Sequence, residues 1–257
     1  MEFIIIPLVA LLTSGLTLFS GFGLGTLLLP AFLLFFPAEL AVAMTAIVHF
    51  LNNLFKLGLL GRHANLRVVL RFGIPAIVAA FAGAALLFAV SAEEALVTYT
   101  ALGKTFSITP IKLLMALLIA AFALFESLPS LQSLQFKPKY LPLGGLLSGF
   151  FGGLSGHQGA LRSAFLVRAG LSKESFIATG VMIACLIDLT RLSVYARHLS
   201  VVGLGENTLL LVAATLSAFL GAFVGNRLVA KATMQTVQRI VAVLLFVIAG
   251  LLGAGLI

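Results

Sequence analysis

The chain has very little charge. Of its 257 residues, 16 are Lys or Arg and 8 are Asp or Glu, which is 9%, whereas 61% are hydrophobic and the mean hydropathy is +1.19. An ordinary soluble domain carries about 25% charged residues, and a folded surface in water is roughly 40% polar. The deficit excludes a soluble enzyme, a secreted disulfide scaffold and a disordered chain. It predicts an all-α polytopic membrane protein.

Other scarce residue types exclude further classes. Cys185 is the single cysteine, so an intramolecular disulfide or a site of several thiolates cannot form. The sequence has no Ser/His/Asp set, no HExxH and no phosphate-binding loop, so neither an enzyme, a metal nor a cofactor is expected. The net charge of +8 comes from residues placed singly or in pairs between apolar blocks. This pattern is typical of cytoplasmic loops and not of a nucleic-acid-binding surface. The amino-terminal residues lack a basic region and a cleavage site, so a cleaved signal peptide is not expected.

Long uncharged runs mark eight hydrophobic segments. Their uncharged parts are Phe3–Ala38, Leu40–Phe55, Phe72–Ala92, Leu113–Phe125, Tyr140–Leu161, Ser175–Ile187, Asn207–Asn226 and Ile240–Ile257. Most reach the length of one crossing, about 20 residues, once their flanks are added. The first segment is too long for one crossing, and the fifth, Tyr140–Ala169, is split into pieces of roughly half a membrane.

Glycine interrupts these two unusual segments, at residues 20–26 and 152–159. Glycine at this density unwinds a helix, and the unpaired N–H groups of a half-helix N-terminus attract an anion. The candidate substrate contacts in the two breaks are Ser20, Gly23, Gly25, Thr26, Ser155, Gly156, His157, Gln158 and Gly159. The alternative is helix packing, because Gly149 with Gly153 and Gly152 with Gly156 form small-xxx-small pairs.

The two breaks belong to an internal repeat. Four motifs recur in order and at nearly one spacing. Ser14-Gly15 matches Ser148-Gly149, and Ala31-Phe32-Leu33 matches Ala164-Phe165-Leu166. The stretch that begins at Asn53 matches the one at Asp188, and the stretch that begins at Ala80 matches the one at Ala218. We therefore expect two repeats of four hydrophobic segments and divide the chain into 1–103 and 104–257, a division with three of the uncharged runs before it and five after it. Duplicated halves with a broken segment at the same place indicate a secondary transporter.

Polar residues lie on the helix that follows each break. His49, Asn53 and Lys56 share one helical face, with Asn52 adjacent, and the matching face in the second half holds Asp188 and Arg191. Ionisable residues inside a membrane are candidate functional residues, and Arg191 could grip an oxyanion. Arg162, on the half-helix after Gly159, is a further candidate.

Structural roles are the alternatives for these residues. Lys56 and Arg191 could snorkel, and Asp188 with Arg191 could be a structural pair. Asp188, taken as the only acid inside the core of a span, is either a proton carrier or a fixed counter-ion. His157 is either a hydrogen-bonding residue or a proton relay.

The glycine break before Leu27-Leu28-Leu29-Pro30, the helix through Asn53 and Lys56, and the second copy at Gly149–Gly159 resemble the TauE/SafE sulfite exporter family. The resemblance covers nearly the whole chain, since the family is itself a duplication of a four-segment unit. It implies a permease of the bacterial inner membrane that moves sulfite or small organosulfonates, usually outward. The expected partners are this anion, the lipid bilayer and a second copy of the chain in a homodimer.

Two topologies fit the charge pattern. Arg62, Arg67 and Arg71 place the loop after the second segment in the cytoplasm. Either all eight segments cross, or segments one and five are re-entrant and the halves are inverted repeats, which the half-membrane pieces favour. A secondary carrier is the leading function, with an anion channel and a non-transporting membrane subunit as the alternatives.

Overall fold

The structure, a computed structural model, describes residues 1–20, 24–92, 94–101, 103–197, 204–228 and 234–257. Side chains within these ranges are described except at residues 16–20, 129, 132, 225–228 and 234–240. The long helices of the first part are α1 (Glu2–Ser20), α2 (Leu24–Leu33), α3 (Ala38–Leu60), α4 (Leu66–Ser91) and α5 (Pro110–Ser127). Those of the second part are α7 (Leu141–Ser155), α8 (Gly159–Leu166), α9 (Lys173–Tyr195), α10 (Thr208–Leu228) and α11 (Met234–Gly253). Short helical turns, η1 (Gly61–His63), α6 (Pro129–Gln132), η2 (Pro138–Tyr140) and η3 (Leu204–Asn207), connect them.

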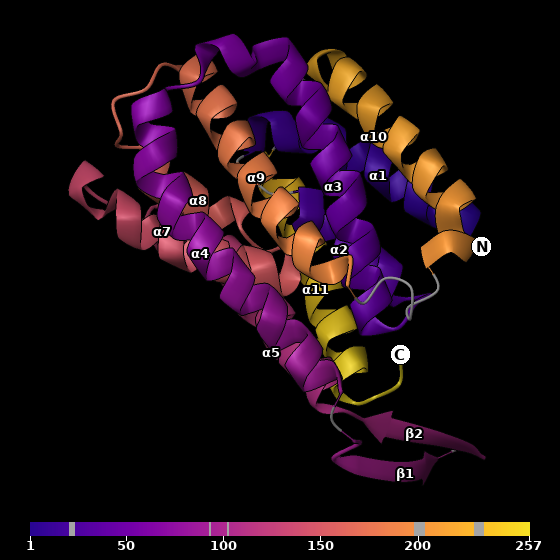
Figure 1. Cartoon of the computed structure of the whole chain (residues 1–257). Helices are drawn as coiled ribbons and strands as arrows, with labels where there is room; N and C mark the ends of the chain where they lie inside the picture. The colour runs from indigo at the N-terminus through magenta and orange to yellow at the C-terminus, as the bar shows by residue number, and fades with distance from the viewer. Residues whose placement is uncertain (21–23, 93, 102, 198–203, 229–233) are drawn as a thin grey trace.

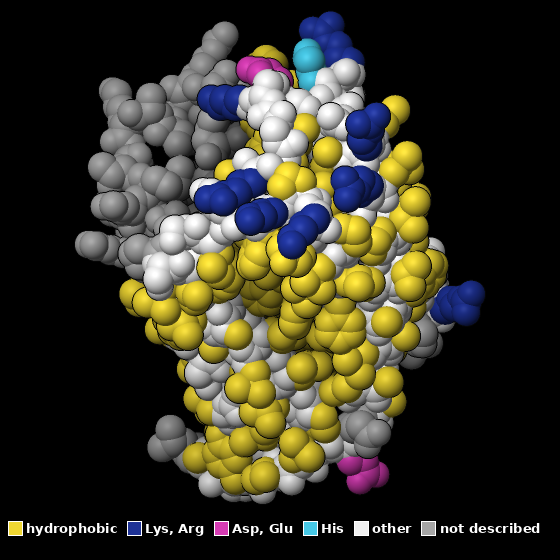
Figure 2. All heavy atoms as spheres, turned by 90° about the vertical axis from the view of Figure 1, so that its left-hand side faces the viewer, with side chains coloured by type: hydrophobic (Ala, Val, Ile, Leu, Met, Phe, Trp, Pro, Cys, Tyr) yellow, Lys and Arg dark blue, Asp and Glu magenta, His cyan; other side chains and the backbone are white. Residues whose placement is uncertain are grey.

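Five helical stretches of the described chain are long and apolar enough to cross a membrane. They are Ala38–His63, Leu66–Ser91, Pro110–Ser127, Lys173–Tyr195 and Leu204–Val224. Shorter apolar helices cover Glu2–Gly15, Leu24–Leu33 and Val241–Gly253. The prediction of an all-α polytopic membrane protein is confirmed. Figure 2 shows Lys and Arg side chains gathered toward one end of the molecule above a mostly hydrophobic surface.

A small β-hairpin occupies the stretch between α4 and α5, which lies between two of the hydrophobic segments expected from the sequence. Strands β1 (Val97–Ala101) and β2 (Lys104–Ile108) pair antiparallel, from Val97 opposite Ile108 to Ala101 opposite Lys104. The Tyr99 hydroxyl donates a hydrogen bond to the carbonyl oxygen of Ala254, 2.6 Å away, at the end of α11. The hairpin therefore ties the carboxyl-terminal end of the chain to the α4–α5 connection, at the bottom of Figure 1.

Glycine lets the longest helix pairs approach closely. Helix α4 packs along α7, and α1 packs along α10. A Cβ added at Gly145, Gly149 or Gly153 would overlap with the backbone carbonyl oxygens of Phe72, Ala76 and Ala80 on α4. At Gly221 it would overlap with the carbonyl oxygen of Leu11 on α1. Small residues at such interfaces are the usual means of helix association in a membrane, so Gly149 and Gly153 serve packing, as the alternative interpretation held.

The helices of the first part (α1–α5) and those of the second part (α7–α11) make matching contacts. Exchanging α1 with α7 and α4 with α10 turns the α1–α10 pair into the α4–α7 pair, and α3 packs against α9 while α5 packs against α11. In Figure 1, α4 runs downward to the hairpin and α9 runs downward beside it, whereas α10 runs upward. The helices that matter for the site, α3 and α9, cross at the centre of the molecule with the α2 and α7–α8 helix ends beside them.

Candidate functional site

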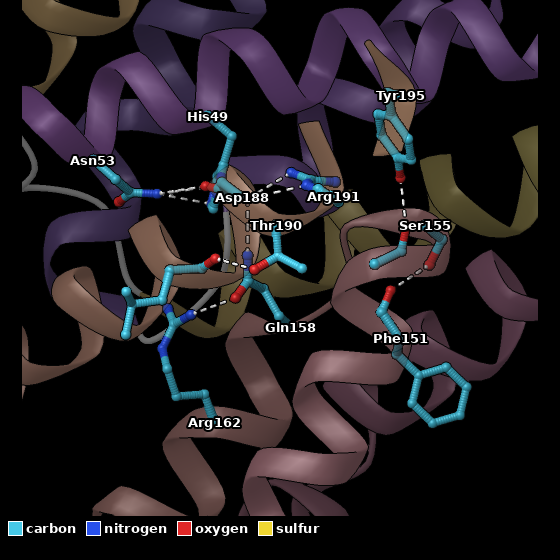
Figure 3. A network of polar contacts seen from close by, with 12 residues as sticks. His49, Asn53, Phe151, Ser155, Gln158, Arg162, Asp188, Thr190, Arg191 and Tyr195 are labelled. Carbon is cyan, nitrogen blue, oxygen red and sulfur yellow. Dashed lines mark hydrogen bonds and ion pairs between the residues drawn. The ribbon is translucent and has the colours of Figure 1, made fainter. Parts of the chain in front are cut away.

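Asp188 is the centre of a buried polar network. Its side chain is fully buried in α9. Oδ1 accepts hydrogen bonds from Arg191 Nε at 3.0 Å and from Gln158 Nε2 at 3.2 Å, and Arg191 Nη2 lies 2.8 Å from the same oxygen. Arg191 is at i+3 on the same helix, which places it directly over Asp188. Figure 3 shows the carboxylate between these groups.

Helix α3 supplies the other side of this network. His49 Nδ1 lies 2.6 Å from Asp188 Oδ2, and Asn53 Nδ2, one turn later, lies 3.5 Å from the same oxygen. Since a carboxylate only accepts, Nδ1 carries the proton, and Nε2 is the ring atom that can accept from Asn53 Nδ2, 3.3 Å away. The carboxylate thus has hydrogen-bonding partners on α3, on α9 and on the α7–α8 connection.

Gln158 links the network to the second glycine break. Its backbone carbonyl accepts from Ser148 Oγ on α7 at 3.1 Å. Its side-chain Oε1 accepts from Arg162 Nη1, one turn into α8, at 3.1 Å. The amide is therefore oriented by both neighbours, with its NH₂ toward Asp188 and its oxygen toward Arg162, as Figure 3 shows.

The second break is a helix end closed by glycine. Helix α7 ends at Ser155, and Gly156 adopts the left-handed conformation at φ 83°, with its N–H bonded to the carbonyls of Gly152 and Phe151. The Gln158 N–H donates to Gly156 O at 3.0 Å. These bonds correct the expectation that the Gly156 and Gln158 amides are free donors, because a left-handed glycine cap uses its N–H within the turn. Gly159 is buried at the first position of α8.

The two glycine regions meet at Gly156. A Cβ added at Gly25, in the first turn of α2, would lie 3.2 Å from the Gly156 carbonyl oxygen and 3.9 Å from Thr45 Cγ2 on α3. A Cβ added at Gly156 would lie 2.7 Å from Arg191 Nη1. Gly25, Gly156 and the Arg191 guanidinium therefore adjoin, and we call this point the glycine junction. Ser20 and Gly23, also predicted to bind substrate, lie outside the residues whose side chains or backbone the structure describes.

Several buried polar atoms around the glycine junction lack a hydrogen-bond partner within the described protein. They are Arg191 Nη1, His157 Nε2 and Thr45 Oγ1. Arg191 Nη2 also lacks a hydrogen-bond partner, because its 2.8 Å contact with Asp188 is an ion pair without hydrogen-bond alignment. The other ring nitrogen of His157 lies 3.0 Å from Ser155 Oγ, and the ring stacks on Phe122 at 4.9 Å. Buried donors are normally satisfied, so this group of atoms suits a bound polar ligand.

Asn52 and Lys56 lie apart from Asp188. The Asn52 side-chain oxygen accepts from Lys56 Nζ at 3.1 Å, and its amide nitrogen donates to Ser14 Oγ on α1 at 3.1 Å and to the Ala218 carbonyl on α10 at 3.3 Å. The expected single face of His49, Asn53 and Lys56 is thus divided, because Lys56 turns toward Asn52. Lys56 is 6% exposed and still interacts electrostatically with Arg162.

Four residues near the site were not predicted. Glu126 is buried in α5 and interacts with the Thr26 hydroxyl; Thr45 and Phe122 border the glycine junction and His157. Tyr195, one turn after Arg191, donates to the Gly153 carbonyl oxygen at 2.5 Å and so fixes α9 to α7. Glu126 is a buried acid that the uncharged run ending at Phe125 left out, since α5 continues through Ser127 and holds Glu126 in its last turn.

The comparison with known families agrees with this architecture. A family model described as "Sulfite exporter TauE/SafE" matches residues 6–252. The chain belongs to the TauE/SafE sulfite exporter family. No match was found among curated proteins or among solved structures. Membership of TauE/SafE confirms the resemblance, and since this is a family of membrane transporters it agrees with the expectation that the protein is not an enzyme.

The Asp188–Arg191 pair gives a testable consequence for stability. Asp188→Asn leaves the Arg191 guanidinium buried without a counter-ion, which should cost about 3–5 kcal/mol and lower the unfolding temperature by on the order of 10 °C. The double variant Asp188→Asn/Arg191→Gln should be more stable than the single one, because no charge is left unpaired. Thermal unfolding in detergent can be followed by a thiol-reactive dye, since Cys185 is the one cysteine and is buried.

The matched control for this prediction is Glu94→Gln. Glu94 is an exposed acid next to the hairpin, so its loss should leave the unfolding temperature unchanged. Wild-type stability of Asp188→Asn would show that the pair contributes nothing to the fold.

Proposed function

We propose that this TauE/SafE protein is a secondary carrier for small sulfur oxyanions, sulfite or organosulfonates, and that it exports them from the cytoplasm. In this proposal the substrate binds at mid-membrane at the glycine junction. Arg191 contacts its oxygens, with His157 and Thr45 beside it and Arg162 and Lys56 further out. The family description supports the sulfur oxyanion, and the contacts described above support the position.

The charge balance of the buried residues supports an anion. Arg191 is fully buried, Lys56 is 6% exposed and Arg162 is half-buried. The Asp188 carboxylate interacts with both arginines, whereas Lys56 contacts Asn52 and interacts electrostatically with Arg162. With Glu126 as the second buried acid, these cations outnumber the acids by one. Uncompensated cations inside a membrane are costly, so an oxyanion of one or two negative charges would lower the free energy of the cluster.

The Arg191 guanidinium nitrogen Nη1, which makes no hydrogen bond within the described protein, is the observation that carries the proposal. The guanidinium also interacts with the Tyr195 hydroxyl. Asp188 holds Nε and Nη2, which fixes the plane of the group, while Nη1 faces Gly156. A planar guanidinium presents fixed N–H donors that suit an oxyanion. Gly156 and Gly25 let the guanidinium and the two backbones approach closely, since an added Cβ would lie 2.7 Å from Arg191 Nη1 at Gly156 and 3.2 Å from the Gly156 carbonyl oxygen at Gly25.

Inverted halves would give this carrier its alternating access. The opposite directions of α4 and α10 and the exchanged pairs α1–α10 and α4–α7 support two halves related by an axis in the membrane plane. Helix α5 would then be the fourth hydrophobic segment of the first half, with α1 and α2 together as the first, so the halves would divide after Ser127 rather than after residue 103. Rocking of one half against the other would expose the junction to each side in turn.

The basic end of the molecule would face the cytoplasm. Arg62 lies in the α3–α4 connection at the top of Figure 1, and the hairpin with Glu94 beside it lies at the opposite end. The positive-inside rule orients such a protein with the α3–α4 connection in the cytoplasm, here of a bacterium, whose inner membrane would hold the protein. All residues of the proposed site belong to one chain.

Transport of labelled sulfite into proteoliposomes tests the proposed function. The wild-type protein should show saturable uptake and counterflow, whereas a channel would show neither. Arg191→Ala should weaken sulfite binding by roughly ten- to hundredfold, because a charge-assisted contact contributes about 1.5–3 kcal/mol. Arg191→Lys keeps the charge and loses the planar guanidinium, so its sulfite affinity should lie between those of the wild type and Arg191→Ala.

Arg197→Ala is the matched control, since Arg197 is exposed just beyond the end of α9. It should transport sulfite like the wild type. Unchanged sulfite affinity in Arg191→Ala, with the protein folded by the Cys185 assay, would remove Arg191 from the site.

Substitutions of glycine test the position of the substrate. Gly25→Val should abolish sulfite uptake with little loss of expression, because its branched side chain would occupy the position proposed for the anion. Gly159→Val, at the buried first position of α8, should reduce uptake as well. Gly25→Ala should be milder, since its Cβ meets the Gly156 carbonyl at 3.2 Å and needs a shift of only a few tenths of an ångström. Gly58→Val, at an exposed position of α3 with nothing within 4 Å of an added Cβ, is the control. Normal uptake by Gly25→Val and Gly159→Val would place the substrate elsewhere.

A further inference from the structure

Glu126 is a second buried acid, on a different helix from the Asp188 network. It lies in the last turn of α5, a candidate membrane span, and is 6% exposed. A carboxylate inside a membrane is costly, and acids in such positions commonly serve proton or ion pathways. Its place in the fold therefore needs a functional or structural reason.

Helix α5 touches both glycine regions through two residues one turn apart. Glu126 interacts with the hydroxyl of Thr26, which is next to Gly25 in the first turn of α2. Phe122 stacks on the ring of His157 at 4.9 Å with an interplanar angle of 14°, and it packs edge-on against Phe151 of α7. Thr26 and His157 are the neighbours of Gly25 and Gly156, the two glycines of the junction. Glu126 is thus one residue removed from the proposed anion position.

Asp188 and Glu126 differ in what their surroundings allow them to do. Asp188 is held by Arg191, His49 and Gln158 at 2.6–3.2 Å. A carboxylate with that many charged and polar donors stays ionised and acts as a fixed counter-ion. Glu126 contacts a neutral hydroxyl that can either donate to a carboxylate or accept from a carboxylic acid. Its environment accommodates both protonation states.

An anion at the junction would favour the protonated form of Glu126. A negative charge nearby raises the proton affinity of a carboxyl group, and by linkage a proton on Glu126 raises the affinity for the anion by the same factor. The titratable residues on described elements packed against α5 are His49, Lys56 and Glu39 on α3, Arg67 and Arg71 on α4, and His157 on the α7–α8 connection. The described side chains of α2 and α11 include none.

We propose that Glu126 binds the proton that this carrier moves together with its anion. The inference rests on the proposed function. The Glu126 carboxylate takes up one H⁺ from the side on which the anion binds, and the resulting carboxylic acid remains protonated while the junction is occupied. When the anion leaves on the other side, the same H⁺ is released there and the carboxylate is restored. Proton and anion therefore travel in the same direction.

The test uses proteoliposomes that contain a pH-sensitive dye, with protein-free liposomes to subtract passive entry of sulfite. An inward sulfite gradient should acidify wild-type vesicles. Glu126→Gln should reduce proton entry about tenfold or more, because an amide cannot take up the proton, while counterflow of labelled against unlabelled sulfite persists. Glu126→Asp, which keeps a titratable carboxyl, should restore part of the proton entry, and Glu94→Gln should behave as the wild type.

Each other outcome overturns a stated part of the account. Wild-type proton entry in Glu126→Gln would show that Glu126 does not carry the proton. Loss of counterflow in the folded variant, by the Cys185 assay, would make Glu126 part of the anion site instead.

If the wild-type protein moves no sulfite, the proposed function fails, and infrared difference spectra between acidic and alkaline buffer still test the proton site. A band of a buried protonated carboxyl that is present in Glu94→Gln and absent in Glu126→Gln supports the assignment of Glu126. An identical band in both variants refutes it.

Discussion

The ion pair between Asp188 and Arg191 is the interaction on which the rest of the site depends. Both side chains are fully buried in a span, where neither charge is tolerated alone. Pairing them satisfies the carboxylate but uses only one side of the guanidinium. The same carboxylate draws His49 from α3 and Gln158 from the α7–α8 connection into fixed positions. The pair therefore orients a cationic edge toward the glycine junction and holds three parts of the fold around it.

Close packing of helices brings the glycine junction to the centre of the molecule. Gly149 and Gly153 let α7 lie against the backbone of α4, and Gly221 lets α10 lie against α1. These contacts position the end of α7 at Gly156 opposite the start of α2 at Gly25. Glycine thus has two separate uses in this chain. Along the helices it permits contact between backbones, and at the helix ends it lets Gly25, Gly156 and the Arg191 guanidinium approach one another.

Much of this arrangement could be predicted from the sequence. Scarce charge and long apolar runs predict the helical membrane fold, and the internal repeat relates the two helices that meet at the site. Polar residues are so rare in these spans that His49, Asn53, Asp188 and Arg191 stand out without any structure. The structure brings these four together with Gln158, which the sequence placed in a separate motif.

The remainder depends on tertiary contacts that spacing does not determine. Lys56 shares a helical face with His49 in the sequence, yet it turns to the oxygen of Asn52 because Ser14 and Ala218 hold that amide from α1 and α10. The Gly156 N–H is used in closing α7, which depends on the left-handed conformation of that one residue. Glu126 follows an uncharged run and resembles a loop residue until α5 is seen to continue through Ser127. The short β-hairpin has only five-residue strands, too brief to stand out beside the long helices.

The most direct test of the central claim is an experimental structure determined with sulfite, or with selenite as its heavier analogue. The account predicts density for one oxyanion at the glycine junction, with an oxygen within hydrogen-bonding distance of Arg191 Nη1 and with Asp188 still paired to the other edge of the guanidinium. A structure in which the anion binds elsewhere, while Gly25 and Gly156 remain in direct contact and Nη1 is bonded to the protein, would contradict it.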